Sequence, residues 1–195
     1  MLATLTGLGL SAAAGLNAYI PFLVVALVAR FTDVITLPPA WAWIESPWAI
    51  GIGVVLLATE VVLDKVPIVD SFNDVVQTAI RPASAGIVVA ATTAAQDVEE
   101  SWDFLQDNAW VSVTLGVVVA LLVHATKATV RPVVDAGTLG AGAPVVSTAE
   151  DTASVGLALT AIFLPVLAFL LLVGLVVVAV WSWGRLRRGR GRARP

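Results

Sequence analysis

The chain has 195 residues and a formal net charge of −3, with 58% hydrophobic but only 13% charged residues. Soluble domains carry about 25% charged residues, so a fold of this size could not cover its surface as soluble proteins do. The absence of cysteine also excludes disulfides and thiolate metal sites. The composition therefore predicts an integral membrane protein.

Five apolar stretches are candidate membrane spans, because a hydrocarbon core about 30 Å thick needs about 20 apolar residues in a helix. They lie at about 2–29, 47–63, 83–95, 109–130 and 152–183. No basic residue precedes the first stretch, so we interpret it as a retained span and not as a cleaved signal peptide. The third is short and rich in small residues, which suits contact with other helices. Pro165 predicts that the over-long last stretch tilts, kinks or divides.

The segment 184–195 holds six of the eleven basic residues. Basic residues that flank spans favour the cytoplasmic side, so we expect a basic cytoplasmic tail. Five spans then place the N-terminus outside. The sequence thus predicts a multi-pass protein of the inner (plasma) membrane, with residues 1–183 as one transmembrane domain.

Two parts of the chain, 49–98 and 110–178, resemble each other. Each begins with an apolar helix that gains ionisable residues towards its end and then reads Pro-x-x-Asp. The first pair is Pro67 and Asp70, and the second is Pro132 and Asp135. The pattern favours an internal repeat of helix, polar hinge, short segment and helix. Chance similarity between two Val- and Leu-rich stretches is the alternative.

The segments after these hinges differ in pattern. Residues 70–82 have apolar positions at helical spacing, which predicts an amphipathic helix of about ten residues, capped by Asp70 and ended by Pro82. Residues 133–151 are rich in Gly and Ala and lack this periodicity. Both segments are expected to be interrupted, re-entrant or interfacial. The expected fold class is therefore an all-α, polytopic transmembrane helix bundle of about five spans with two such segments.

Ionisable residues gather around the hinges. Glu60 and Asp64 are four apart, and His124, Lys127 and Arg131 follow the spacing i, i+3, i+7, so each set shares a helix face. An acidic face and a basic face can pair across the bundle, which lowers the cost of charge in a membrane. The candidate polar pathway comprises Glu60, Asp64, Lys65, Asp70, Asp74, Arg81, His124, Lys127, Arg131 and Asp135.

Several of these residues have a structural alternative. Asp70 and Asp135 can cap helices, and Lys65 can extend from a helix end towards the headgroups. A single histidine without cysteine gives no reason to expect a metal site, and no cofactor is expected. The stripe Gly7, Ser11 and Gly15 is interpreted as a packing face of small residues.

Three stretches, "GLSAAAGLNAYIPFL", "EVVLDKVPIVDSFNDVVQTAIRPASAG" and "HATKATVRP", carry a resemblance to a known family. The sequence resembles the bacterial multi-pass membrane proteins of domain-of-unknown-function family 4126 along most of its length. This resemblance implies an integral membrane protein. It implies no established activity and therefore assigns no catalytic residues.

Interrupted segments at corresponding positions of two halves are typical of a transporter's binding site. We therefore expect a small transporter or channel for an ion or small polar solute. The alternatives are a protein that handles lipid headgroups through Lys127, Arg131 or Arg81, and a structural scaffold without transport activity. No nucleophile–base spacing or nucleotide loop is present, so an enzyme is not expected. The expected partners are membrane lipids and further copies of the chain, and no nucleic acid.

Overall fold

The computed structural model describes residues 2–64, 67–95, 108–139, 141–174 and 176–177. Within these ranges the chain is helical and holds no strand, which confirms the predicted all-α class for this part of the chain. The tail 184–195 lies outside the described residues. The elements are α1 (Leu2–Leu16), α2 (Tyr19–Phe31), α3 (Pro47–Leu63), α4 (Pro67–Ala94), α6 (Ala109–Thr138), α7 (Ala143–Phe163) and a helix at Pro165–Gly174.

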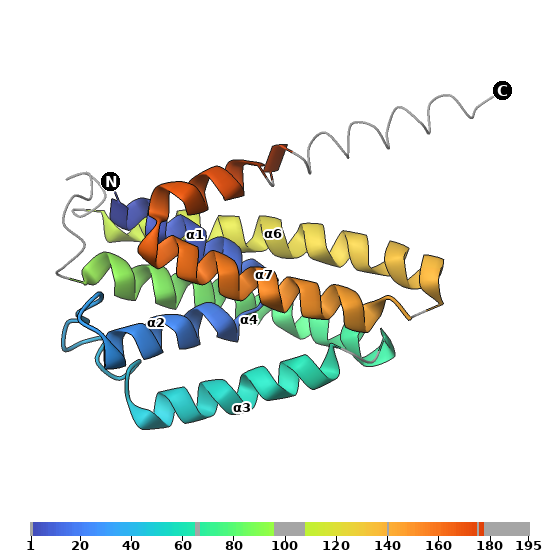
Figure 1. Ribbon diagram of the computed structural model, residues 1–195, viewed down its shortest axis with the longest axis horizontal. Coiled ribbons are helices and arrows are strands. Elements are labelled where there is room, and N and C mark those ends of the chain that lie inside the picture. The colour runs from blue at the N-terminus through green and yellow to red at the C-terminus, as the bar shows by residue number, and fades with distance from the viewer. Residues whose placement is uncertain (1, 65–66, 96–107, 140, 175, 178–195) are drawn as a thin grey trace.

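The long helices run lengthwise through the molecule, and α1 lies among them (Figure 1). Helices α4 and α6 have 28 and 30 residues, which corresponds to about 42 Å and 45 Å. Helix α1 packs against α4, α6 and α7, whereas α2 packs mainly against α3 and α7. The bundle is therefore arranged around α1.

The first predicted span is not one helix. The structure divides it into α1, of 15 residues, and α2, of 13 residues, each about 20 Å long and so about half the length of α4. The side-chain oxygen of Asn17 accepts hydrogen bonds from the backbone N–H groups of Tyr19 (3.0 Å) and Ile20 (3.2 Å), as a helix cap does. Pro21 follows in the first turn of α2, where a missing N–H group is harmless.

The break between α1 and α2 lies at the middle of the bundle. Arg81, near the middle of α4, donates to the carbonyl oxygen of Gly15 at 3.0 Å. Ser154, near the middle of α7, donates to the carbonyl oxygen of Ala13 at 2.9 Å. The two short helices enter from the same end of the molecule and meet at this depth (Figure 1).

The prediction that a helix ends at Pro82 is wrong, because α4 continues through Pro82 to Ala94 and so includes all but the last residue of the predicted third span. A proline inside a helix removes one hydrogen bond, and neighbouring helices can compensate for it. Here the side chains of Arg81 and Ser84 donate to carbonyl oxygens at the break between α1 and α2. These contacts hold α4 against its neighbours on both sides of Pro82. Helix α4 begins at Pro67, so Asp70 lies inside its first turns and is not its N-cap.

The second predicted segment, 133–151, is interrupted, but the helix break lies between α6 and α7 and not at Pro132. Helix α6 continues to Thr138, and α7 begins at Ala143 after a turn that holds Leu139 in the left-handed conformation (φ 53°). Pro132 therefore lies inside α6, whereas Pro67 begins α4, and the two Pro-x-x-Asp motifs occupy different structural positions. The predicted division at Pro165 is confirmed, because α7 ends at Phe163 and a new helix follows.

Both long helices carry buried polar side chains beside large apolar side chains that are exposed. On α4, Gln77 and Arg81 are buried while Val75 is 70% exposed. On α6, Lys127 is buried while Val133 is 72% exposed. Soluble proteins show the reverse pattern. Two segments of the described chain, Val75–Ala94 and Trp110–Thr138, are long and apolar enough to cross a membrane, and the number of five spans stays a prediction.

The small-residue stripe of α1 forms a packing face, as its spacing predicts. Gly7, Ser11 and Gly15 are all buried, and α6 approaches α1 closely at Gly15. A methyl group added there would lie 2.7 Å from the backbone oxygen of Ala120 and 2.7 Å from the Cβ atom of Val123. Only glycine therefore fits this contact without moving a helix.

We expect Gly15→Ala to lower the free energy of unfolding by about 1–3 kcal/mol, because the backbones of α1 and α6 must separate. Thermal unfolding in detergent, followed by circular dichroism, measures the change. The matched control is Gly51→Ala on α3, where an added methyl group meets no atom within 4 Å. That control should be neutral or stabilising by up to about 1 kcal/mol. Equal effects of the two substitutions would contradict the packing account.

Candidate functional site

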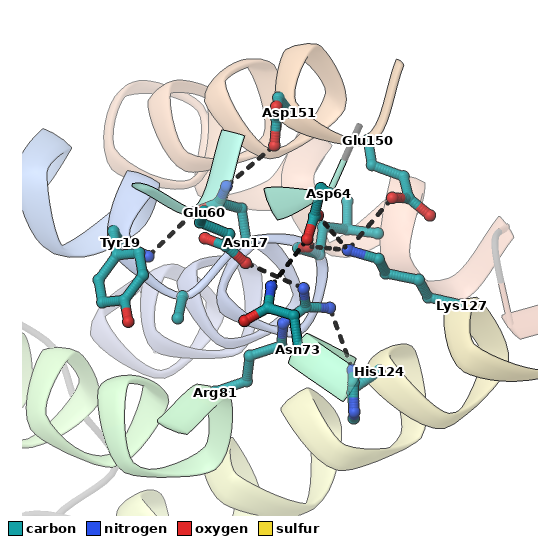
Figure 2. Close-up of polar contacts among 12 residues, drawn as sticks. Asn17, Tyr19, Glu60, Asp64, Asn73, Arg81, His124, Lys127, Glu150 and Asp151 are labelled. Carbon is teal, nitrogen blue, oxygen red and sulfur yellow. Dashed lines mark hydrogen bonds and ion pairs between the residues drawn. The ribbon is translucent and has the colours of Figure 1, made fainter. Parts of the chain in front are cut away.

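A buried polar cluster lies beside the break between α1 and α2 (Figure 2). It is defined by Glu60, Asp64, Asn73, Arg81, His124, Lys127, Arg131 and Glu150. These side chains come from α3 and its C-cap and from α4, α6 and α7, and carbonyl oxygens of α1 complete the cluster. Since helical spacing places each set on one face, four helices direct their polar faces to one place.

The inner half of the cluster consists of Arg81 and its partners Glu60 and His124. The side chain of Arg81 is fully buried. One terminal nitrogen, Nη2, pairs with Glu60 Oε1 at 3.0 Å. The other, Nη1, donates to the Gly15 carbonyl and to His124 Nδ1, both at 3.0 Å. A guanidinium group has donors only. Arg81 thus holds α3, α6 and the end of α1 together in one plane of hydrogen bonds.

The contacts of His124 define the tautomer of its imidazole ring. Because Arg81 can only donate, the Nδ1 atom of His124 must accept and carries no proton. The Nε2 atom then carries the ring proton and donates to the hydroxyl oxygen of Thr78 at 3.0 Å. His124 is therefore neutral in this arrangement. A proton on Nδ1 would break the contact with Arg81.

The outer half of the cluster has Asp64 at its centre and also contains Asn73, Lys127, Arg131 and Glu150. The Oδ1 atom of Asp64 accepts from the side-chain amide of Asn73 at 2.8 Å. Its Oδ2 atom lies 3.4 Å from Lys127 Nζ and 3.1 Å from Arg131 Nη2. Lys127 also donates to the carbonyl oxygen of Leu16 at 3.2 Å. Asp64 therefore binds both cations of α6, and the C-terminal end of α1 shares one of them.

Glu150 closes the outer edge of the cluster. Its Oε2 atom lies 3.2 Å from Lys127 Nζ and accepts from both Nε and Nη2 of Arg131. Its side chain is 14% exposed, whereas those of Asp64, Lys127 and Arg131 are 2–5% exposed. Glu150 is therefore the most accessible charged member of these ion pairs.

The end of α1 contributes favourable electrostatics. The last carbonyl groups of a helix carry partial negative charge and lack partners within the helix. Here Arg81 and Lys127 donate to the carbonyls of Gly15 and Leu16. Two buried cations thus satisfy the C-terminal end of a helix that stops at the middle of the bundle.

Asn17 connects the break to α7. While its side-chain oxygen caps α2, its amide nitrogen donates to Asp151 Oδ1 at 2.9 Å. Both ends of one small side chain are therefore used, one within the break and one between helices. This arrangement fixes the direction in which α2 leaves α1.

We expect Asn17→Ala to lower the free energy of unfolding by about 1–3 kcal/mol, because the cap of α2 and the partner of Asp151 disappear together. Asn17→Asp keeps the cap but places two carboxylates together, so it should be destabilising and should improve when combined with Asp151→Asn. Unfolding in detergent measures all three variants. If Asn17→Ala unfolds as easily as the wild type, the break does not depend on this cap.

Three buried polar atoms near Arg81 have no hydrogen-bond partner among the described residues. They are Glu60 Oε2, Arg81 Nε and Gln77 Oε1. Glu60 pairs with Arg81, and Gln77 lies one turn from Arg81 on the same face of α4. Buried polar atoms normally find partners, and those that lack one mark places for a proton, water or ligand. The inner half of the cluster therefore holds hydrogen-bonding capacity that the described residues do not use.

The structure brings together six of the ten residues that the sequence selects, and the acidic and basic faces pair across the bundle as expected. These six are Glu60, Asp64, Arg81, His124, Lys127 and Arg131. Lys65 lies outside the described residues. The backbones of Asp70 and Asp74 lie in α4 and that of Asp135 in α6, but their side chains are not among those that the structure describes.

Sequence reasoning missed Asn17, Asn73 and Glu150. Asn17 had a usable signal, because a cap residue followed by Pro21 marks a helix start inside an apolar run. Asn73 had one as well, since it precedes Gln77 and Arg81 at spacings of four. Glu150 lies in a Gly- and Ala-rich segment, and no local pattern connects it to Arg131.

The chemistry of the cluster is that of ion pairing and hydrogen bonding. In the described part of the chain, no group of three or more His, Cys, Asp or Glu side chains could hold a metal ion. The charged members come as three carboxylates and three cations around one neutral imidazole. Such a site can bind a charged or polar solute by exchanging internal pairs for contacts with it.

Comparison with curated proteins and with solved structures found no match. The chain does match the family described as "Domain of unknown function (DUF4126)" over residues 4–185, which is most of its length. This match confirms the resemblance of the three sequence stretches. The protein therefore belongs to the DUF4126 family.

Proposed function

We propose that this protein is a membrane-embedded transporter for an ion or small polar solute, and that the polar cluster is its binding site. The observation that carries the proposal is the break between α1 and α2, which lies at the middle of the bundle among buried charges. Discontinuous helices whose ends meet charged groups at mid-membrane are typical of transporter binding sites.

The surface of the molecule supports its location in a membrane. Large apolar side chains such as Val55, Val75 and Val133 are 65–72% exposed on the long helices. Monomeric soluble proteins rarely expose contiguous apolar surface of this kind, whereas lipid requires it. We therefore propose that α3, α4, α6 and α7 lie in contact with lipid and that the cluster faces away from it.

The burial of the cluster supports a closed state of such a transporter. The side chains of Arg81, Glu60 and Lys127 are 0–2% exposed, and each has a charged partner. Charges inside a membrane are costly, and where they occur they commonly belong to ion or solute pathways. A purely structural cluster is the competing interpretation, and it requires that these pairs never open to water.

Flux into proteoliposomes tests the proposal. Light scattering follows the vesicle volume after an osmotic step. Potassium salts of small anions with valinomycin test anion movement, and salts of different cations with a permeant anion test cation movement. Neutral polar solutes form the third class. We expect wild-type protein to accelerate the movement of at least one class over protein-free vesicles, and Asp64→Asn to abolish this effect. Arg30→Gln, outside the cluster, should leave the flux unchanged. If no class moves faster, transport is contradicted.

A further inference from the structure

We propose that Lys127 and Arg131 form a binding site for an anionic group, a carboxylate or a phosphate, and that Glu150 occupies this site as a displaceable internal substitute. The inference rests on the proposed function, because it names the class of solute that the cluster binds. It also assigns a direction of entry, along the contact between α6 and α7.

The geometry around Glu150 resembles that of a bound anion. Two cations converge on its Oε2 atom: Lys127 Nζ at 3.2 Å, and Arg131 through both Nε and Nη2. A forked guanidinium group beside an ammonium group is an arrangement that proteins use for carboxylates and phosphates. Figure 2 shows the end of the Lys127 side chain between Asp64 and Glu150.

Glu150 is held less firmly than Asp64. Asp64 has an additional hydrogen bond from Asn73, and its side chain is only 3% exposed. The Glu150 side chain makes the polar contacts described above with Lys127 and Arg131, and this side chain is 14% exposed. Its helix, α7, packs mainly on α1 and α2 and touches α6 much less. A small movement of α7 or of one side chain is therefore enough to uncover the cations.

The balance of charge favours an anion as the ligand. With Glu150 in place, Arg81, Lys127 and Arg131 balance Glu60, Asp64 and Glu150. When Glu150 leaves, three cations face two carboxylates among the described side chains of the cluster, and a bound monoanion restores this balance. A cationic ligand would have to displace Lys127 or Arg131, both of which come from the interior of a long helix and are almost fully buried.

The test uses inorganic phosphate as the probe and purified full-length protein in detergent. Binding is measured as the rise in unfolding temperature with potassium phosphate, against potassium chloride at equal ionic strength. We expect Glu150→Gln to bind phosphate at least about tenfold more tightly than the wild type, because the competing carboxylate is gone. Asp151→Asn, next in the chain but bonded to Asn17, should bind like the wild type.

A second substitution shows where the phosphate binds. Adding Arg131→Gln to Glu150→Gln should remove the gain. If Glu150→Gln and Glu150→Ala do not fold in chloride, we expect phosphate to restore folding, and failure in both salts overturns the proposal. Unchanged phosphate affinity in folded Glu150→Gln overturns it as well, because a merely structural pair predicts lost stability without a gain in binding.

Nanodiscs distinguish the two sources of the anionic group. If the group belongs to a lipid, phosphatidic acid in a phosphatidylcholine nanodisc should stabilise Glu150→Gln and compete with inorganic phosphate. If the anion is free in solution, phosphate should bind equally well in phosphatidylcholine nanodiscs with and without phosphatidic acid.

The result of this test can be distinguished from the result of the transport test. Phosphate binding without any flux contradicts transport alone, whereas flux of cations or neutral solutes without phosphate binding contradicts the anion site alone.

Discussion

Arg81→Met is expected to lower the free energy of unfolding by about 3–5 kcal/mol, because it leaves a buried carboxylate without its partner. Glu60 would lose its only described ion pair, and the Gly15 carbonyl and His124 Nδ1 would lose their donor. Among the described residues, Arg81 is the side chain that contacts α1, α3 and α6 together in the inner half of the cluster. Denaturant or thermal unfolding in detergent, followed by circular dichroism, measures the loss.

The double variant Glu60→Gln with Arg81→Met separates the charge effect from the loss of packing. Because no uncompensated charge remains, it should be more stable than Arg81→Met alone, and the double-mutant cycle should give a coupling energy of about 1–3 kcal/mol. Arg30→Met is the matched control, since the hydrogen bond of Arg30 to the Glu45 carbonyl is exposed. It should change stability by no more than about 0.5 kcal/mol. A loss below about 1 kcal/mol for Arg81→Met would contradict the assigned role.

Asp64→Asn is expected to cost about 3 kcal/mol, at the lower end of the range for a broken buried pair. The substitution keeps the shape and an acceptor for Asn73, but it removes the charge that Lys127 and Arg131 share. Glu150 remains beside both cations and limits the loss. The same variant should show no solute flux in proteoliposomes, since the outer half of the cluster is then left with excess positive charge.

The control for Asp64→Asn is Asp33→Asn, at an exposed position between α2 and α3. It removes the same charge from the chain and should change neither stability nor flux. Asp64→Glu should preserve the charge and retain part of the flux, although the longer side chain disturbs the contact with Asn73. If Asp64→Asn transports like the wild type, Asp64 is a structural residue.

Much of the site followed from spacing along the helices. Helical spacing places Glu60 and Asp64 on one face, and it places His124, Lys127 and Arg131 on another. Unpaired charges are costly in a membrane, so faces of opposite charge are expected to pair. The structure brings Asp64 to Lys127 and Arg131 accordingly. The spacing of residues was sufficient to predict these faces, because the face on which a residue lies depends only on the geometry of its own helix.

The breaks in the helices were harder to predict, because tertiary contacts decide them. Pro82 interrupts the hydrogen bonding of α4 without ending it, since the neighbouring helices hold both of its sides. The chain instead breaks at Asn17, where one side chain satisfies the start of the new helix. Glu150 meets Arg131 because α7 begins at Ala143, soon after α6 ends at Thr138, and a Gly-rich sequence does not reveal where one helix ends and the next begins.

A transporter of this kind requires water to reach the buried break between α1 and α2 at some stage of its cycle. Ser84 and Ser154 donate to the carbonyls of Ala18 and Ala13 at this break, and the chain has no native cysteine. Ser84→Cys and Ser154→Cys, as single near-isosteric variants in sealed vesicles, report access to a membrane-impermeant thiol reagent. Ser11→Cys, in the dry packing face of α1, is the matched control.

We expect the cysteines at positions 84 and 154 to react while the protein is folded, from one side of the membrane or from both. Their rates should change when a transported solute is added, whereas the cysteine at position 11 stays protected until the protein is unfolded. If all three cysteines stay equally protected in the folded protein and react only after unfolding, the cluster is permanently dry, and the account of a transporter is wrong.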